Sequence, residues 1–344
     1  MDVSNVRPIS ILAGYLVACA ALAAICISTI YRQAVSSKAA SRRRYAIIVF
    51  SALAALSLAT TWYHMFCFFK WSYQQWESTH LDKLDDELHL GEWLRDTKLF
   101  KQAWVSTLEQ PQRVFWSLQI FAFCANWSVM LAWQDTKRII PHLWIFMLLG
   151  QIVAISFAAN LSFLAFLVFE DPNTSIDTIK QEKTVSLSSN KSHSLLRKSW
   201  FAVLVVTMGC AVAIPSKLDH PKFMYLLLAP HVLAFVPLLM NKLIGSREPV
   251  VMDEQPPQKV RAGVRALVAG VCIYHLLSPA ASCWGDATRA LYEHPAVSSV
   301  GWDVICCWIS FFAWFHVRIT DDWEKEHGEP MFFSRRVEKP AVHP

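Results

Sequence analysis

The sequence of 344 residues has few charged and few small residues. Asp, Glu, Lys and Arg together make up 17% of it, and it contains only 10 Gly. A charged fraction this low excludes an ordinary soluble protein. Scarce Gly argues against a loose membrane bundle built on contacts between small residues. The polar stretches between apolar blocks are too short to fold as separate extramembrane catalytic domains.

The motifs of soluble enzymes and of metal sites are also missing. The chain has no P-loop, no G-x-G-x-x-G, no H-E-x-x-H, no G-x-S-x-G and no D-D-x-x-D run that would bind magnesium diphosphate. It has nine Cys but no C-x-x-C, so the Cys indicate small buried side chains rather than a disulfide frame. We therefore expect no metal and no other cofactor. Lys and Arg are not gathered in one tract with aromatic residues, so nucleic acid is not an expected partner.

What the chain does have is apolar and aromatic residues in long blocks. It is 54% hydrophobic, with a mean hydropathy of +0.31, 15 Trp and 21 Phe. Roughly 20 apolar residues in a helix cross the 30 Å hydrocarbon layer. The pattern predicts an all-α polytopic membrane protein, a single helical bundle over residues 1–320 with about eight spans. The predicted spans are Ile9–Tyr31, Tyr45–Phe69, Val114–Trp133, Ile140–Phe169, Trp200–Ile214, Met224–Leu243, Val264–Leu277 and Val300–Val317.

The connections between spans differ in character. Between the second and third spans, apolar residues recur three and four positions apart, which predicts an interfacial amphipathic helix over about 78–110. Residues 171–198 are rich in Ser, Thr, Asn and Lys and predict a mobile loop, while 321–344 form a polar C-terminal tail. Arg and Lys after the first span favour a lumenal N-terminus, although the side that bears the N-terminus carries more Lys and Arg in total because its loops are longer. We expect an integral multi-pass protein of the endoplasmic reticulum membrane.

Polar groups inside or beside the spans are the candidates for function. An ionised side chain at mid-span costs roughly 2.5–3.5 kcal/mol, so such groups are retained where they have a role. No two span histidines lie three or four residues apart, which favours packed His over a haem or metal site. The candidates are the acids Glu92, Asp96, Glu170, Asp171 and Asp303, the histidines His64, His142, His231, His275 and His316, and the neutral residues Gln119, Asn126, Gln151, Asn160 and Tyr274.

Glu92 and Asp96 are the most suggestive pair. Four residues apart on a helix, they share one face, and two adjacent carboxyls raise the pKa of one of them enough to make it a general acid. The alternative is a solvated acidic stripe in which Arg95, or a Lys at a nearby helical position, screens Asp96. Asp303 stands near the start of the last span, where a carboxylate at a helix N-terminus is favourable without any catalysis.

The aromatic residues also have two readings. Trp62 and Trp116 belong to a set that could line a cavity and stabilise a carbocation through their π faces, for about 0.5–2 kcal/mol each. Alternatively, such residues form interfacial belts or fill the core. The predicted substrate-binding residues are Trp62, His64, Trp116, Asn126, Asn160 and Tyr274.

One stretch also resembles a known family. The run Gly91-Glu92-Trp93-Leu94-Arg95-Asp96-Thr97, with Phe115-Trp116-Ser117-Leu118-Gln119, Pro141-His142-Leu143-Trp144 and Leu148-Leu149-Gly150-Gln151, resembles the fungal membrane-bound terpene cyclases of the ascofuranone and ascochlorin type. The likeness covers about Trp93 to Asn160. It implies an all-helical enzyme of secondary metabolism that needs no metal or redox cofactor.

The resemblance implies a hydrophobic small-molecule substrate, an epoxidised prenyl chain on an aromatic meroterpenoid. A carboxylic acid protonates the epoxide, neighbouring alkenes or oxygens attack the opened ring, and a base removes the last proton. Asp96 is the position carried over as proton donor. The family pattern also implies a second acid in the early spans. None occurs between Ile9 and Phe69, which leaves Glu92 or Asp303 as the substitute.

Two other classes of function stay open on the sequence. A membrane transporter or lipid-binding protein would use the same acids and histidines as a path across the bilayer. The lack of inverted repeats and the few Gly and Pro interruptions argue against it. A structural scaffold in contact only with membrane lipids would leave the aromatic content unexplained.

Overall fold

A computed structural model describes residues 5–37, 43–80, 88–169, 187–244 and 283–327. Over these residues the regular structure is helical. The helices are α1 (Val6–Ser36), α3 (Arg44–Ser78), α4 (Leu90–Asp96), α5 (Leu99–Leu108), α6 (Pro111–Asp135), α7 (Leu143–Ile152), α8 (Ile155–Val168), α9 (Leu187–Ala213), the 3₁₀ turn η4 (Pro215–Lys217), α10 (Phe223–Leu233), α11 (Val236–Ile244), α13 (Cys283–Glu293) and α14 (Pro295–His327).

Several of these helices are suited to a membrane. In the described residues, α1, α3, α6 and the Pro295–Arg318 part of α14 are long and apolar enough to cross one, and α10 with α11 forms a fifth candidate bent by 49°. The all-α class and the apolar spanning helices are thus confirmed, whereas a total of eight spans is not. The predicted span Val264–Leu277 lies outside the described residues.

The centre of the bundle is α8. Every residue from Ile155 to Val168 is buried, so this helix has no polar face to turn outward. A helix that is apolar all round is stable only inside a larger assembly. Around α8 pack α1, α3, α6 and α14. The outer helix α1, by contrast, exposes large apolar residues such as Ile11 and Val17, as expected of a lipid-facing surface.

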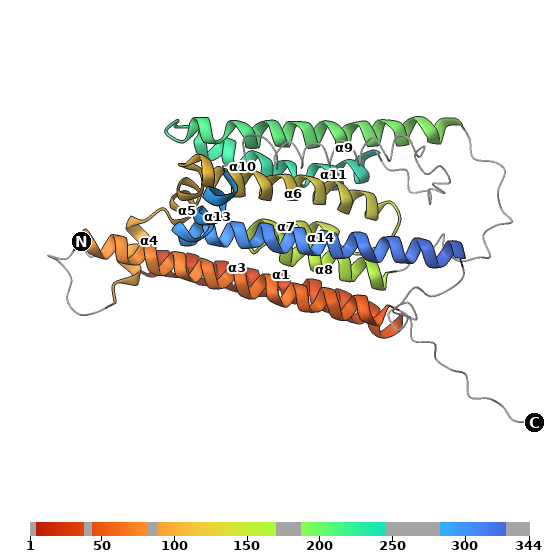
Figure 1. The fold of residues 1–344 in the computed structure, drawn as a ribbon, viewed down its shortest axis with the longest axis horizontal. Helices are drawn as coiled ribbons and strands as arrows, with labels where there is room; N and C mark the ends of the chain where they lie inside the picture. The colour runs from red at the N-terminus through yellow and green to blue at the C-terminus, as the bar shows by residue number, and fades with distance from the viewer. Residues whose placement is uncertain (1–4, 38–42, 81–87, 170–186, 245–282, 328–344) are drawn as a thin grey trace, which may run out of the picture.

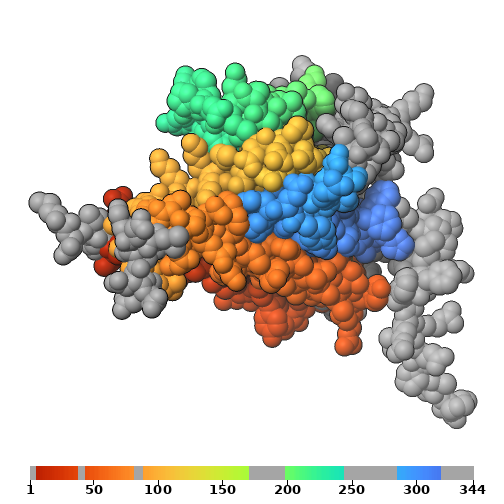
Figure 2. Space-filling view, turned by 60° about the vertical axis from the view of Figure 1, so that its left-hand side comes forward, coloured from red at the N-terminus to blue at the C-terminus, as the bar shows by residue number. Residues whose placement is uncertain are grey.

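The long helices run side by side in layers (Figure 1). At one edge α9 packs on α10, α11 and α6. The middle contains α14 with α7 and α8, and α3 and α1 form the other edge. In Figure 2 the blue helices α13 and α14 lie between the yellow α6 and the orange α3. The short helices α4, α5 and α13 gather at the end of the bundle that carries the N-terminus (Figure 1).

The interfacial helix predicted over 78–110 takes a different form. Helix α3 continues to Ser78, and the segment that follows contains two short helices, α4 and α5, separated by an extended Thr97 (φ −103°, ψ 131°). Asp96 and Thr97 disfavour helix interiors because their short polar side chains bond to local groups. Hydrogen bonds from Trp93 to Ser72 (3.2 Å) and from Ser72 to Gln102 (2.6 Å) fasten this segment to the end of α3.

Two further boundaries need correction. The mobile loop predicted over 171–198 is wrong from Leu187 on, because α9 begins there. Extending an existing helix into Ser, Asn and Lys costs only tenths of a kcal/mol per residue. The polar tail predicted from 321 is likewise helical as far as His327, where α14 ends. Its Glu and Lys residues are good helix formers.

Candidate functional site

The predicted span Ile140–Phe169 is broken at its middle. Between α7 and α8, Val153 leaves the helix and Ala154 is extended (φ −168°, ψ 137°). Such a break strips backbone groups of their helical partners. Within a membrane these groups must be satisfied by protein or by a polar cavity. Two side chains from other helices supply hydrogen-bond partners for these backbone groups. The Tyr15 hydroxyl on α1 donates to the Ile152 carbonyl at 2.7 Å, and the Asp303 carboxyl on α14 accepts hydrogen bonds from the first N–H groups of α8.

Asp303 is held by the first turn of α8. Its Oδ2 accepts from the Ile155 N–H at 3.0 Å and its Oδ1 from the Ser156 N–H at 2.8 Å. Asp303 is buried, with 8% of the residue exposed. Among the described residues no Lys or Arg forms an ion pair with it. A helix N-terminus presents unpaired N–H groups and a partial positive charge, so it stabilises negative charge on this carboxyl.

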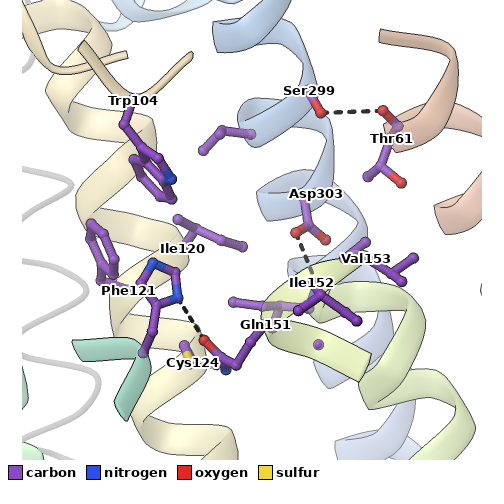
Figure 3. A pocket seen from close by; sticks show the side chains of 15 residues that line it. Thr61, Trp104, Ile120, Phe121, Cys124, Gln151, Ile152, Val153, Ser299 and Asp303 are labelled. Carbon is purple, nitrogen blue, oxygen red and sulfur yellow. Dashed lines mark hydrogen bonds between the residues drawn. The ribbon is translucent and has the colours of Figure 1, made fainter. Parts of the chain in front are cut away.

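A small cavity lies where α7 and α8 separate. It has a volume of about 150 Å³ and contains Asp303 in its wall. Figure 3 shows Asp303 reaching from α14 to the break, with Trp104 and Phe121 across the cavity. The Trp104 and Phe121 rings are stacked, with centroids 5.2 Å apart. One wall of the cavity thus carries a carboxyl group and another an aromatic pair.

His231 is the second ionisable group of this cavity, and its proton can be assigned. Gln151 donates through Nε2 to Cys124 Sγ (3.1 Å) and Met147 Sδ (3.3 Å). A thioether sulfur can only accept a hydrogen bond, so the amide nitrogen of Gln151 points toward Met147 and its Oε1 points toward His231. Oε1 lies 2.7 Å from His231 Nδ1, and because an amide oxygen can only accept, Nδ1 is the donor. Nδ1 therefore carries the hydrogen and Nε2 holds a lone pair. Nε2 is buried without a hydrogen-bond partner, and His231 lines the cavity.

A larger apolar groove adjoins this cavity. It measures about 750 Å³ and runs between α1, α3, α4 and α5 to the end of α7. Gln151 and Ile152 line both spaces. The groove is within the size range of pockets that enclose a drug-sized ligand, roughly 300–1,000 Å³. A ligand in the groove would therefore meet the Asp303 cavity at its inner end.

The predicted acid pair Glu92 and Asp96 lies outside the cavity. Both are in α4, but they turn to different partners: Glu92 Oε2 is 3.9 Å from His89 Nδ1, and Asp96 Oδ1 is 2.9 Å from Arg95 Nε. The Asp96 side chain is 36% exposed. Hydrogen bonds from the Arg95 guanidinium, and then from the Trp76 indole, lower the pKa of Asp96 below its ordinary value. This is the opposite of the raised pKa that the spacing predicted.

The predicted substrate-binding residues are dispersed. Trp62 contacts Phe66, and His64 stacks on Trp302. Trp116 is buried, with its indole donating to the Ala287 carbonyl at 2.9 Å. None of Trp62, His64, Trp116, Asn126 and Asn160 lines either space.

The two predicted asparagines, Asn126 and Asn160, form hydrogen bonds within and between helices. Asn126 is exposed and donates back to Ala122 on its own helix at 2.8 Å. Asn160 is fully buried and donates to Ser57 and Ser310 across three packed helices, a polar contact of the kind that joins helices in membranes. Tyr274, His275, Glu170 and Asp171 lie outside the described residues.

The cavity residues left out of the predicted site include Trp104, Phe121, Gln151 and His231. Gln151 and His231 were visible as polar residues in apolar blocks, but nothing in the sequence paired them across 80 positions. Trp104 fits the apolar face of the segment after α3, yet its ring contacts Phe121 and His231. Only the helix packing brings these residues together.

Comparison with known proteins gives no relative. No protein-family model matches the sequence, and neither a curated protein nor a solved structure matches the chain. Within the described residues no group of three or more His, Cys, Asp or Glu is arranged to hold a metal ion. A function must therefore be argued from the cavity itself.

Proposed function

We propose that the protein is a membrane-embedded terpene cyclase that opens a protonated epoxide on the prenyl chain of a meroterpenoid and cyclises it without a metal. The observation that carries this proposal is the buried Asp303 in the cavity wall, with two N–H groups of α8 on its oxygens. The resemblance of the Trp93–Asn160 region to the ascofuranone and ascochlorin cyclases supports the same reaction. We place the enzyme in the endoplasmic reticulum membrane.

In this proposal Asp303, not Asp96, is the proton donor, and it starts the reaction as the neutral carboxylic acid. The carboxyl proton passes to the epoxide oxygen as a C–O bond breaks, which gives a hydroxyl group and a tertiary carbocation. Negative charge then develops on Asp303. The Ile155 and Ser156 N–H groups already point at its oxygens, so the carboxylate is stabilised without any reorganisation. Removing one such preorganised donor costs on the order of 10²–10³ in rate in enzymes that depend on it.

The aromatic wall suits the cation that follows. Trp104 and Phe121 line the cavity, and a cation held over the face of such a ring gains about 0.5–2 kcal/mol. An alkene or oxygen of the same substrate then attacks the cation and closes a ring. A dry, closed site keeps water from reacting with the cation first.

His231 is placed to complete the reaction as the base. Its Nε2 lone pair is buried next to the cavity while Gln151 holds Nδ1–H. The final cation loses a proton to Nε2, which leaves an imidazolium on His231 and a carboxylate on Asp303. After the product leaves, water that enters the cavity takes the proton from His231 and returns one to Asp303, which restores both groups. Substrate and product are isomers, because every proton taken up is released again.

Turnover of a synthetic epoxy-prenyl arene tests the proposal. Purified protein in detergent, or microsomes containing it, should convert the epoxide to a cyclic alcohol of identical mass, detected by liquid chromatography and mass spectrometry. Conversion should persist in EDTA and without a nicotinamide. Conversion that is absent from the wild-type protein for prenyl chains of several lengths would overturn the cyclase assignment.

The break between α7 and α8 also fits a transporter. Discontinuous helices whose ends meet at a central site are typical of secondary transporters. A transporter would accumulate the substrate inside sealed vesicles with its structure unchanged. The same vesicle assay, with the product analysed by mass spectrometry, separates accumulation from isomerisation.

A further inference from the structure

The apolar groove has charge at one end only. Its outer end carries Arg7, which is exposed, and Arg95, whose side chain is 37% exposed. Its walls contain apolar side chains such as Ile11, Phe68 and Leu99. Within the described residues, Arg7 has no ion-pair partner. Over the described part of the chain, Arg7 therefore adds an unpaired positive charge beside an apolar channel.

The groove also has a defined length and a polar inner end. Arg7, Ile11 and Tyr15 are spaced by four residues and so share one face of α1. From Arg7 to Tyr15 the helix rises about 12 Å. Tyr15 donates to the Ile152 carbonyl at 2.7 Å, and Ile152 with Gln151 separates the groove from the Asp303 cavity.

From this arrangement we propose that the groove binds a single-chain amphiphile with an acidic head group. The head lies at Arg7 and Arg95, and the chain follows α1 toward Gln151. A guanidinium matches a carboxylate with paired N–H donors, and this contact has its full strength only for an ionised head group. In the proposed reaction, the amphiphile would be an arene with an acidic substituent and its prenyl end would point at Asp303. The binding site itself does not depend on that reaction.

Arg95 is partly neutralised in the free protein. Asp96 accepts from its Nε at 2.9 Å and from its Nη2 at 3.5 Å. An acidic ligand competes with Asp96 for this guanidinium. Removing the Asp96 charge should therefore strengthen binding of the acid, whereas removing the Arg7 charge should weaken it.

The test is equilibrium binding of dansyl-undecanoic acid and of dansyl-undecanol to the full chain in phosphatidylcholine nanodiscs. We expect the wild-type protein to bind the acid about tenfold more tightly than the alcohol. Arg7→Gln should remove most of that preference. Asp96→Asn should raise the affinity for the acid about threefold, because Asp96 no longer competes with the ligand for the Arg95 guanidinium. Arg32→Gln changes an exposed arginine near the other end of α1 and is the matched control.

Binding of the alcohol should be the same in all four proteins, which also verifies that each variant is folded. Equal affinity for acid and alcohol would overturn the inference, as would an Arg7→Gln result identical to that of Arg32→Gln. Displacement of the acid by phosphatidylglycerol would assign the groove to a two-chain lipid instead. Because no turnover is measured, failure of the cyclase proposal would leave this outcome unaffected.

Discussion

Asp96 and Asp303 are both single carboxyls on helices, but they differ in exposure and in the groups that contact their oxygens. Asp96 lies at the end of the seven-residue helix α4, is 36% exposed and pairs with Arg95. Asp303 lies inside the bundle, is 8% exposed, and has backbone N–H groups rather than a cation on its oxygens. An exposed ion pair is worth about 0–1 kcal/mol, whereas buried hydrogen bonds to a charged group are worth roughly 1.5–3 kcal/mol.

The comparison shows that four-residue spacing is insufficient to identify a proton donor. Glu92 and Asp96 do share the short helix α4, as the spacing requires. The spacing says nothing of Arg95 and Trp76, which stabilise the Asp96 carboxylate. Asp303 has no acidic residue three or four positions away on α14. It lines a cavity because the break between α7 and α8 lies against this part of α14.

The largest effect is expected from Asp303→Asn. If Asp303 is the proton donor, turnover of an epoxy-prenyl arene should fall by about 10³-fold or more, because general acid catalysis and the preorganised N–H groups act through the same carboxyl. The substitution also replaces one acceptor of the α8 amides, at a cost of about 1–3 kcal/mol in stability. Size-exclusion chromatography and circular dichroism should therefore accompany the assay. A folded variant with more than a tenth of wild-type turnover would contradict the assignment.

His231→Gln should have the next largest effect. Without the Nε2 lone pair, turnover is expected to fall roughly 10- to 100-fold, and the product mixture should shift toward other alkene isomers or a water adduct. His64→Gln is the matched control, since His64 stacks on Trp302 outside both spaces. An unchanged product mixture from His231→Gln would remove the histidine from the reaction.

Asp96→Asn should change turnover by less than about threefold, because an exposed carboxylate paired with Arg95 contributes little. Glu92→Gln should behave in the same way. Both variants are measured against the same substrate as Asp303→Asn, at saturating concentration. A hundredfold loss in Asp96→Asn would restore this residue as proton donor and reverse the comparison.

The smallest effect concerns His294, a buried group that lines neither space. Burial, with a contribution from the Arg113 charge, lowers the pKa of His294 from 6.5 to about 4, and its ring lies 4.2 Å from that of Trp71. The His294 imidazole takes up a proton more readily in the unfolded chain than in the folded protein. The contribution of this group to the stability of the fold is therefore fully present above about pH 6.5 and is lost as the pH falls toward 4. The melting temperature in detergent should drop by about 2–4 °C over that range through this group.

His294→Gln should flatten that part of the pH profile and leave product formation at pH 7.5 within about twofold, since burial without a cavity affects stability rather than the reaction. Melting curves of the two proteins at matched pH values check this. A large loss of turnover in His294→Gln would show that the end of the bundle takes part in the reaction.

Much of the fold was predictable because hydrophobic runs and helix length depend on local sequence. The predicted segments Tyr45–Phe69 and Val114–Trp133 lie within α3 and α6. Boundaries were less accurate where polar residues extend a helix, as at Leu187 and His327. The break at Ala154 carries no local signal, since the Ile140–Phe169 run contains no Pro or Gly at that position.

The sequence by itself determined that the chain forms apolar helices, because helical hydrogen bonds are made within a segment and apolar residues must leave water. It also supplied the candidates Asp303, His231 and Gln151 as polar residues in apolar blocks. Only the tertiary structure decided which of them share a cavity. The α8 amides that bind Asp303 lie 147 and 148 positions away from it, and contacts at that separation depend on how α7, α8 and α14 pack, which no local pattern encodes.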